Sequence, residues 1–336
     1  MNHQGSATMI KRALGCLIGS AIGDAMGMPA SFMSPGQIKR IYGRITDFLP
    51  PDQEQIQHGN LAQGTITDDT EESLIIADVL LQAGRFDQTL FIQKMKKWAI
   101  EADMLNTTVI GPSTRRFLEA IVNDQDPREN GKIGDTNGAA MRVAPVGIFH
   151  HADVAKAIRA AIESASVSHG SKPGLASAAA VAAAIATAIQ GECTVRAVLE
   201  AALLGATEGE KAGFDIPAPS VSARIGLAMK VVDEYREAPV DEISHRLYQL
   251  IGAGMKSYES IPLSLGVFYA ANGEFEPGLL SAINLGDDAD TNGAIVGALC
   301  GAYCGADHIK PEWIEKLQRT NQIDFMQIAK GLLAQP

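Results

Sequence analysis

Residues Asn284–Gly293 read NLGDDADTNG, and Ala294–Ala306 continue as AIVGALCGAYCGA, a run made almost entirely of small apolar residues. The run predicts a helix, and its small side chains allow neighbouring helix backbones to approach closely. A second run of this kind, LASAAAVAAAIATAI, occupies Leu175–Ile189. We expect both helices at the centre of an all-α fold, with other helices packed around them.

Apolar residues at helical spacing recur along the chain, whereas alternation with a period of two is scarce. They predict helices at Glu72–Gly84, Phe117–Val122, Val154–Ser164, Val195–Leu203, Ser222–Tyr235 and Pro311–Thr320. Segments rich in Gly, Asn, Asp and Pro predict loops at Leu49–Ile66, Leu105–Ser113, Asn123–Asn137 and Glu208–Pro219. No Pro/Ser-rich linker and no repeat divides the chain, so we expect residues 1–336 to form a single domain.

The composition predicts a globular protein with a tightly packed core. The 336 residues are 46% hydrophobic but only 5% aromatic, so the core must be built from Ala, Ile, Leu, Val and Met. The net charge of −11 argues against nonspecific binding to nucleic acid or to an anionic membrane. We expect a cytoplasmic monomer with neither of those partners.

Two apolar segments and four cysteines have ordinary structural interpretations. The run after Lys11 and Arg12 contains glycines and ends in Asp24, which favours a core helix over a signal peptide. Leu175–Ile189 is short for a membrane span. Without a second Cys/His pair a zinc site is improbable, and buried free thiols are expected at Cys16, Cys193, Cys300 and Cys304.

Two acidic motifs each precede a predicted helix. Gly64–Glu72 reads GTITDDTEE, and Asp287–Thr291 reads DDADT. Helix capping explains one carboxylate at each place, and for the first motif alone capping is as good an explanation as ligand binding. Three carboxylates within four positions exceed what a helix N-terminus needs, and their mutual repulsion indicates a bound cation.

The donor atoms in both motifs favour a hard cation. Neither motif contains His or Cys, and carboxylate and hydroxyl oxygens suit Mg²⁺, Mn²⁺ or Ca²⁺ rather than zinc. Each motif offers two carboxylates and a Thr hydroxyl. If the two helix N-termini face each other, six residues could hold two ions.

Ordered blocks along nearly the whole chain resemble the ADP-ribosylglycohydrolase family. The most specific are TDDT at Thr67–Thr70 and GDDADTNGAIVGALCGA at Gly286–Ala302. The others are GCLIGSAIGDAMGMP from Gly15, NGAAMRVAPVG from Asn137, SVSHGSKPGLASAAA from Ser166 and ESIPLSLGVF from Glu259. The resemblance implies an all-α orthogonal bundle with a binuclear Mg²⁺ or Mn²⁺ centre.

The resemblance also implies an activity and a set of metal ligands. Family members hydrolyse the glycosidic bond between ADP-ribose and a protein side chain, classically arginine. The implied ligands are Thr67, Asp68, Asp69, Asp288, Asp290 and Thr291. The ions would hold the ribose hydroxyls and activate a water, while nearby carboxylates accept its proton and stabilise an oxocarbenium-like transition state. The acids that we assign to catalysis are Asp68, Asp69, Asp288 and Asp287.

Further blocks are expected to bind the ADP-ribose moiety of a modified protein or a small molecule. The loop Gly134, Asp135, Thr136, Asn137 and Gly138 matches the family's loop for the diphosphate and ribose, although alone it reads as an ordinary turn. His169 matches a family histidine near the ligand. The alternative is that it has a purely structural role. Arg142 is either a ligand contact or a buried ion-pair partner. Ile110–Thr114 resembles the loop that borders the site.

The match to the family breaks at two positions. Ala30 and Ser31 stand where a glutamate facing the metals is expected, and Asp287 stands where the family has Gly. Asp287 could compensate for the missing acid or could face solvent. Two alternatives to arginine-linked substrates therefore stay open: hydrolysis of small ribosides or free ADP-ribose derivatives, and non-catalytic binding of ADP-ribose.

Overall fold

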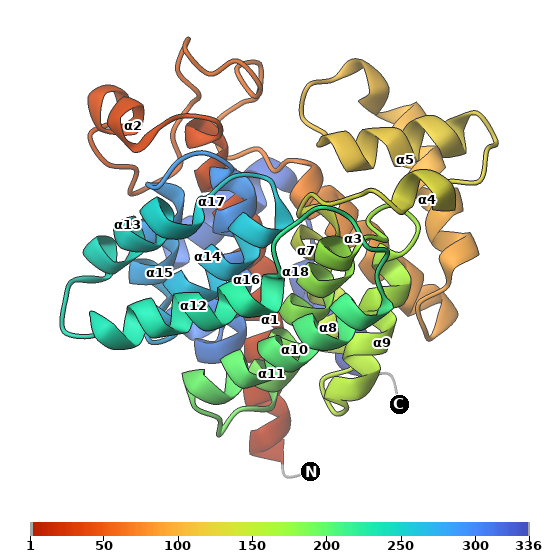
Figure 1. The fold of residues 1–336 in the computed structure, drawn as a ribbon. Helices are drawn as coiled ribbons and strands as arrows, with labels where there is room; N and C mark the ends of the chain where they lie inside the picture. The colour runs from red at the N-terminus through yellow and green to blue at the C-terminus, as the bar shows by residue number, and fades with distance from the viewer. Residues whose placement is uncertain (1–2, 335–336) are drawn as a thin grey trace.

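The computed structural model describes residues 3–334, and these form an all-α protein without a β-strand in that range, as the sequence predicts. The helices are α1 (His3–Gly27), α2 (Pro35–Ile41), α3 (Asp68–Ala83), α4 (Gln88–Glu101), α5 (Pro112–Val122), α6 (Arg128–Gly131), α7 (Gly138–Met141), α8 (Ala144–Phe149), α9 (Val154–Ala165), α10 (Lys172–Gln190), α11 (Val195–Ala212), α12 (Val221–Glu234), α13 (Val240–Ile251), α14 (Ser257–Ala270), α15 (Phe275–Ile283), α16 (Ala289–Cys304), α17 (Pro311–Asn321) and α18 (Phe325–Leu333). Figure 1 shows α1 running through the centre, with α12–α15 on one side and α3–α9 on the other.

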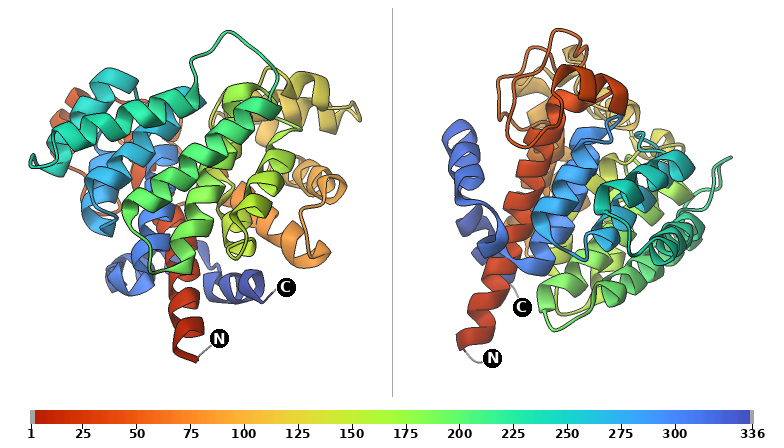
Figure 2. Two further views of the ribbon diagram at one scale, coloured as in Figure 1. Left: turned by 60° about the horizontal axis from the view of Figure 1, so that its bottom comes forward. Right: turned by 90° about the vertical axis from the view of Figure 1, so that its left-hand side faces the viewer.

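The antiparallel helices α1 and α16 pack with their backbones in close contact. A Cβ atom on Gly19 would lie 2.3 Å from the Gly297 carbonyl oxygen, and one on Gly23 would lie 2.0 Å from the Gly293 oxygen. Glycine recurs at every fourth residue over Gly15–Gly27 of α1 and Gly293–Gly301 of α16, so the two backbones touch over these stretches. The right-hand view of Figure 2 shows α1 between the C-terminal helices α17 and α18 on one side and the rest of the bundle on the other.

Gly297→Ala is expected to lower the free energy of unfolding by about 3 kcal/mol, because the new methyl group forces two backbones apart. Its Cβ would lie 2.1 Å from the Gly19 carbonyl oxygen. Gly226→Ala in α12 is the matched control, because no described atom lies within 4 Å of the added Cβ. The control should stabilise the helix by up to about 1 kcal/mol. Urea unfolding measures both, and equal effects would contradict the close-contact interpretation.

The alanine-rich helix α10 is buried over almost its whole length and packs against α8, α9, α11 and α16, so the prediction of a central helix at Leu175–Ile189 is confirmed. Two segments, Ala7–Ala30 and Lys172–Gln190, are long and apolar enough to cross a membrane. Their most apolar windows are 94% and 89% buried inside the protein, which is the burial of core helices.

The four cysteines are free, with Cys16 and Cys300 buried and Cys193 and Cys304 half-buried.

The prediction of a loop over Glu208–Pro219 is wrong at its start, because α11 continues to Ala212. Glycines inside the start of this segment and just before it favour a loop, but both serve helix packing. A Cβ on Gly205 would lie 2.3 Å from the Ala179 carbonyl oxygen, and one on Gly209 would lie 2.5 Å from the Ala176 Cα. The chain over residues 46–66 contains no helix, in agreement with the loop predicted at Leu49–Ile66.

Candidate active site

The structure brings the two acidic motifs together at the N-termini of α3 and α16. Thr67 is the N-cap of α3, where its hydroxyl accepts from the Asp69 amide at 3.3 Å, and Asp288 occupies the cap position of α16. One cavity of about 40 Å³ is lined by both helices, through Asp68, Asp69, Asp288, Asp290 and Thr291. A space of this size holds a few water-sized particles and is too small for a nucleotide.

A further carboxylate, which the sequence pattern does not single out, fixes the start of α3. Asp24 of α1 accepts from the Thr67 amide at 3.0 Å and hydroxyl at 2.8 Å, and from the Thr70 hydroxyl at 2.5 Å. Burial raises the pKa of Asp24 to about 6, while these hydrogen bonds act in the opposite direction. A lone acid inside an apolar helical run is the signal that could have revealed Asp24, because a buried carboxylate needs partners.

The carboxylates of the cavity repel one another. Burial raises the pKa of Asp68, Asp69 and Asp288 well above the usual range, and neighbouring acids raise the pKa of each further. The Oδ1 atom of Asp69 is buried and accepts no hydrogen bond from residues 3–334. Such a cluster is stable only if its members are protonated or a cation compensates them.

Asp290 differs from its neighbours because polar groups surround it. Its carboxylate lies 2.9 Å from His58 Nε2. Its backbone amide donates to Ser31 Oγ at 3.2 Å, and the Thr291 amide donates to its Oδ1 at 3.0 Å. Burial acts to raise the pKa of Asp290, but the contacts with His58, Ser31 and Thr291 outweigh it and lower that pKa. The sequence gives no signal for His58, which lies in a loop without periodicity.

Asp287 lies outside the carboxylate cavity. A Cβ on Gly254 would be 3.3 Å from its Oδ2, and its charge raises the pKa of Glu259, after the larger effect of burial. The backbone of Asp287 has a φ of +53°, in the left-handed region that favours glycine, and its amide donates to the Met33 carbonyl at 2.8 Å. The main chain of Asp287 thus holds the segment that follows Ser31, while its side chain does not line the cavity.

Asp287→Gly is expected to raise the free energy of unfolding by up to about 1 kcal/mol, because glycine relieves the left-handed backbone and removes a charge beside Glu259. Glu192→Gly, at an exposed residue with a φ of +53°, is a control for the backbone contribution. The hydrolysis rate should stay within about twofold of the unsubstituted protein. A large loss of rate would instead support a compensating role for this acid.

The predicted ADP-ribose loop divides into two parts. Thr136, Asn137 and Gly138 line the cavity, and Asn137 Nδ2 donates to Asp288 Oδ2 at 2.5 Å. The other two residues face structural partners. The Gly134 carbonyl accepts from Ser171 Oγ at 2.5 Å, and Asp135 pairs with Lys256 at 2.6 Å.

His169 and Arg142 form a buried polar chain behind this loop. His169 Nε2 lies 3.1 Å from Thr136 Oγ1, and its Nδ1 lies 2.8 Å from Ser168 Oγ. Arg142 donates to the same Ser168 oxygen at 2.8 Å and to Glu72 Oε2 at 2.6 Å. Burial and the Arg142 charge lower the pKa of His169 well below its usual range. Of the two alternatives for Arg142, the structure shows the buried ion pair.

Two open grooves adjoin the cavity. One of about 500 Å³ shares His58, Asp68 and Val109 with it, and one of about 460 Å³ shares Phe32, Val109 and Gly111. Each has the size of a ligand pocket. The predicted bordering loop takes part, since Gly111 and Thr114 line the cavity itself. A ligand too large for the cavity therefore has room beside the carboxylates.

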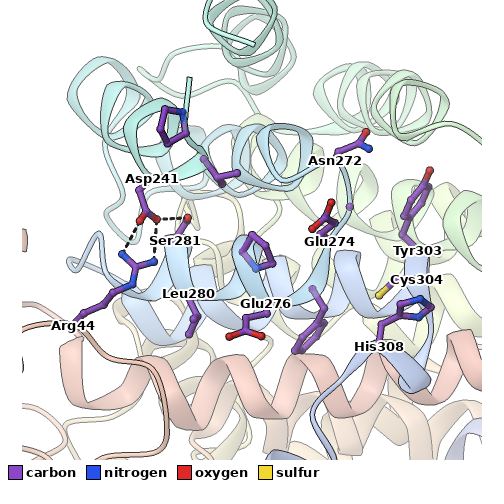
Figure 3. A pocket seen from close by; sticks show the side chains of 15 residues that line it. Arg44, Asp241, Asn272, Glu274, Glu276, Leu280, Ser281, Tyr303, Cys304 and His308 are labelled. Carbon is purple, nitrogen blue, oxygen red and sulfur yellow. Dashed lines mark hydrogen bonds and ion pairs between the residues drawn. The ribbon is translucent and has the colours of Figure 1, made fainter. Parts of the chain in front are cut away.

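A larger cavity of about 730 Å³ lies elsewhere, where α13 and α15 begin and α16 ends (Figure 3). Its most prominent charges are already paired. Arg44 binds both oxygens of Asp241, which also accepts from Ser281 at 2.5 Å, and Glu276 pairs with Lys310 at 2.5 Å. None of the predicted site residues lines it, and its paired charges distinguish it from the carboxylate cavity.

The carboxylate cavity offers oxygen donors for a hard cation, but these donors do not converge on a single point. Among residues 3–334, no group of three or more His, Cys, Asp and Glu side chains is arranged to hold an ion as it stands. The unpartnered Asp69 oxygen and the crowded acids nevertheless fit Mg²⁺ or Mn²⁺ chemistry. Thr67 donates its proton to Asp24 and keeps a lone pair, so its hydroxyl can still act as a ligand.

Known proteins resemble this chain in sequence over most of its length. The chain is 35% identical to an uncharacterized protein, YegU, of Escherichia coli, with 96% of each chain covered. It is 27% identical to the ADP-ribosylarginine hydrolase Tri1 of Pseudomonas putida, over 94% of this chain and 76% of the relative. The ADP-ribosyl-[dinitrogen reductase] glycohydrolase of Rhodospirillum rubrum is also 27% identical, with 96% of each chain covered.

A solved structure and a family profile agree with these relatives. An ADP-ribosylglycohydrolase-related protein complex superposes with a TM-score of 0.71 at 25% identity, over 97% of this chain and 98% of that chain. The sequence profile of ADP-ribosylglycohydrolase matches residues 5–336. With the acidic motifs meeting at one buried cavity, the chain belongs to the ADP-ribosylglycohydrolase family.

Proposed function

We propose that this hydrolase cleaves the N-glycosidic bond that joins ADP-ribose to an arginine side chain, with two divalent metal ions, Mg²⁺ or Mn²⁺. The observation that carries the proposal is the meeting of Asp68 and Asp69 with Asp288 and Asp290 in one buried cavity beside two open grooves. The names of the relatives from Pseudomonas putida and Rhodospirillum rubrum support an ADP-ribosylated substrate, and the first supports arginine.

The proposed ligands are Thr67, Asp68 and Asp69 from α3 and its cap, and Asp288, Asp290 and Thr291 from α16 and its cap. When bound, the ions supply Lewis-acid activation of water and attachment points for the ribose hydroxyls. Asn137, which contacts Asp288 at 2.5 Å, orients that carboxylate from the ADP-ribose loop.

The protein's own acids account for the movement of protons and charge. Asp69 Oδ1, which accepts no hydrogen bond within the described residues, is free to accept a proton from the attacking water. The remaining carboxylates stabilise positive charge as it develops on the ribose ring. The two grooves, which adjoin each other at Thr107, Thr108 and Val109, leave room beside the cavity for the adenosine part and the modified side chain.

The proposal is tested by turnover of ADP-ribosyl-arginine by chelator-treated protein, with and without added Mg²⁺ or Mn²⁺. We expect release of ADP-ribose only after an ion is added. An ADP-ribosyl peptide linked through a hydroxyl oxygen, and simple nucleosides, serve as competing substrates. Turnover of either in place of ADP-ribosyl-arginine would overturn the arginine assignment, and full activity without ions would overturn the metal centre.

A further inference from the structure

His58 is a buried histidine whose ring lacks a hydrogen-bond partner. It lies in the loop between α2 and α3 and is 2% exposed. Neither Nδ1 nor Nε2 makes a hydrogen bond within residues 3–334. Phe32 provides only a tilted ring contact with centroids 6.5 Å apart. Nε2 forms an ion pair with Asp290, whereas Nδ1 has no partner in the described chain, and buried polar atoms without partners are rare, so the ring can take a partner that is not part of the chain.

The ring lies at the wall of the carboxylate cavity, with Nε2 2.9 Å from Asp290 Oδ2. At this distance the two groups form an ion pair, although the angles of a regular hydrogen bond are not met. Two donors that bind one ion at about 2.1 Å in adjacent octahedral positions lie about 3.0 Å apart. The observed distance therefore fits two neighbouring ligands of a single ion, in which the nitrogen presents a lone pair.

The glutamate expected at position 31 is absent, and Ser31 does not replace it at the cavity. Its hydroxyl accepts from the Asp290 amide at 3.2 Å and donates to the Gly27 carbonyl at 3.4 Å, so it is occupied by the backbone. Ser31 is 1% exposed and does not line the cavity.

Gln55 fastens the loop that carries His58 to the segment that carries Ser31. Its side-chain amide donates to the Ser31 carbonyl at 2.8 Å and to the Met28 carbonyl at 3.1 Å. Its Oε1 accepts from the Gln57 amide at 3.0 Å, next to His58. The same contacts therefore hold the loop that carries His58 at the wall of the cavity.

We infer that His58 Nε2 is a ligand of the same ion as Asp290. Because of this nitrogen, the ion site binds a transition-metal ion in preference to Mg²⁺. The inference rests on the metal centre of the proposed function. Imidazole suits first-row transition metals, whereas sites made only of oxygen donors suit Mg²⁺. A structural alternative is that His58 only offsets the charge of Asp290, in which case metal preference would not depend on it.

The test uses the full chain, freed of metal by a chelator, and its His58→Gln variant. Gln offers a hard oxygen donor in place of nitrogen. Calorimetric titrations with Mn²⁺, Co²⁺ and Mg²⁺ give the affinities, and pulsed electron paramagnetic resonance of bound Mn²⁺ detects coupling to a ligand nitrogen. His151→Gln changes another buried histidine, which contacts the Ile148 carbonyl instead, and is the matched control.

We expect the unsubstituted protein and the control to show nitrogen coupling and to bind Co²⁺ at least tenfold more tightly than Mg²⁺. His58→Gln should lose the coupling and about 10–100-fold in Co²⁺ affinity, with little change for Mg²⁺. If the unsubstituted protein bound Mn²⁺ without nitrogen coupling, His58 would not be a ligand, and only this inference would be overturned, not the metal centre. Binding of none of the three ions would overturn the metal centre together with this inference. If His58→Gln fails to fold, the spectrum of the unsubstituted protein decides the question.

Discussion

Asp69→Asn is expected to slow hydrolysis of an ADP-ribosylated substrate by ~10²–10⁴-fold and to raise the thermal stability of the metal-free protein. Asp69 is buried among carboxylates, and one of its oxygens lacks a hydrogen-bond partner in the described chain. Burial, Asp24 and Asp290 all raise its pKa, which means that its charge opposes folding. Asparagine keeps the shape, removes the charge and cannot accept the water's proton.

The two effects of this substitution have opposite signs, which separates them from general damage. Steady-state hydrolysis and thermal unfolding, each with and without Mn²⁺, measure them. Added Mn²⁺ should raise the unfolding temperature of the unsubstituted protein more than that of the variant. Asp78→Asn, at an exposed ion pair on the same helix, should leave the rate unchanged. Joint loss of rate and stability in Asp69→Asn would mean that the residue is structural.

Local signals predict part of the fold, although α13 and α18, which also have an amphipathic period, are absent from the helices that we predict. The small-residue runs of α10 and α16 stand out in the sequence, and both lie at the centre. Helix α14 escapes prediction, because it is buried on nearly all sides and contains Pro262, so it lacks an amphipathic period. The pairing of α1 with α16 depends on glycines about 280 residues apart, such as Gly15 and Gly301, and a single sequence does not show which ones meet.

The residues of the candidate site, too, could be predicted only where their signals are local. The carboxylates of α3 and α16 are evident in the sequence because three acids before an apolar helix exceed the needs of capping. His58 is not, because its position depends on Gln55, which ties a long loop to the end of α1. Asp287 is assigned to catalysis because it could compensate for the acid missing at Ser31, yet its backbone is left-handed and its side chain lies beside Gly254 and Glu259. Conformations that depend on long-range contacts leave no local pattern.

Arg142→Met is expected to lower the free energy of unfolding by about 3–5 kcal/mol, the largest effect on stability that we predict. Arg142 and Glu72 are both fully buried and lie 2.6 Å apart. The guanidinium also donates to Ser168 and lies 5.0 Å from the centre of the Phe91 ring. Burial raises the pKa of Glu72 and Arg142 acts against that rise, so without Arg142 the acid must be protonated or remain as an unpaired buried charge.

A double-mutant cycle separates the value of this ion pair from the cost of breaking it. Arg142→Met combined with Glu72→Leu removes both charges, and this double variant should regain most of the stability that Arg142→Met alone loses. Arg85→Met, at an exposed pair, should change stability by less than about 1 kcal/mol in the same denaturant titration. If the double variant were no more stable than Arg142→Met, the loss would come from the contacts with Ser168 and Phe91. Because Ser168 also contacts His169, which contacts Thr136, that result would make the guanidinium a support of the ADP-ribose loop in its own right.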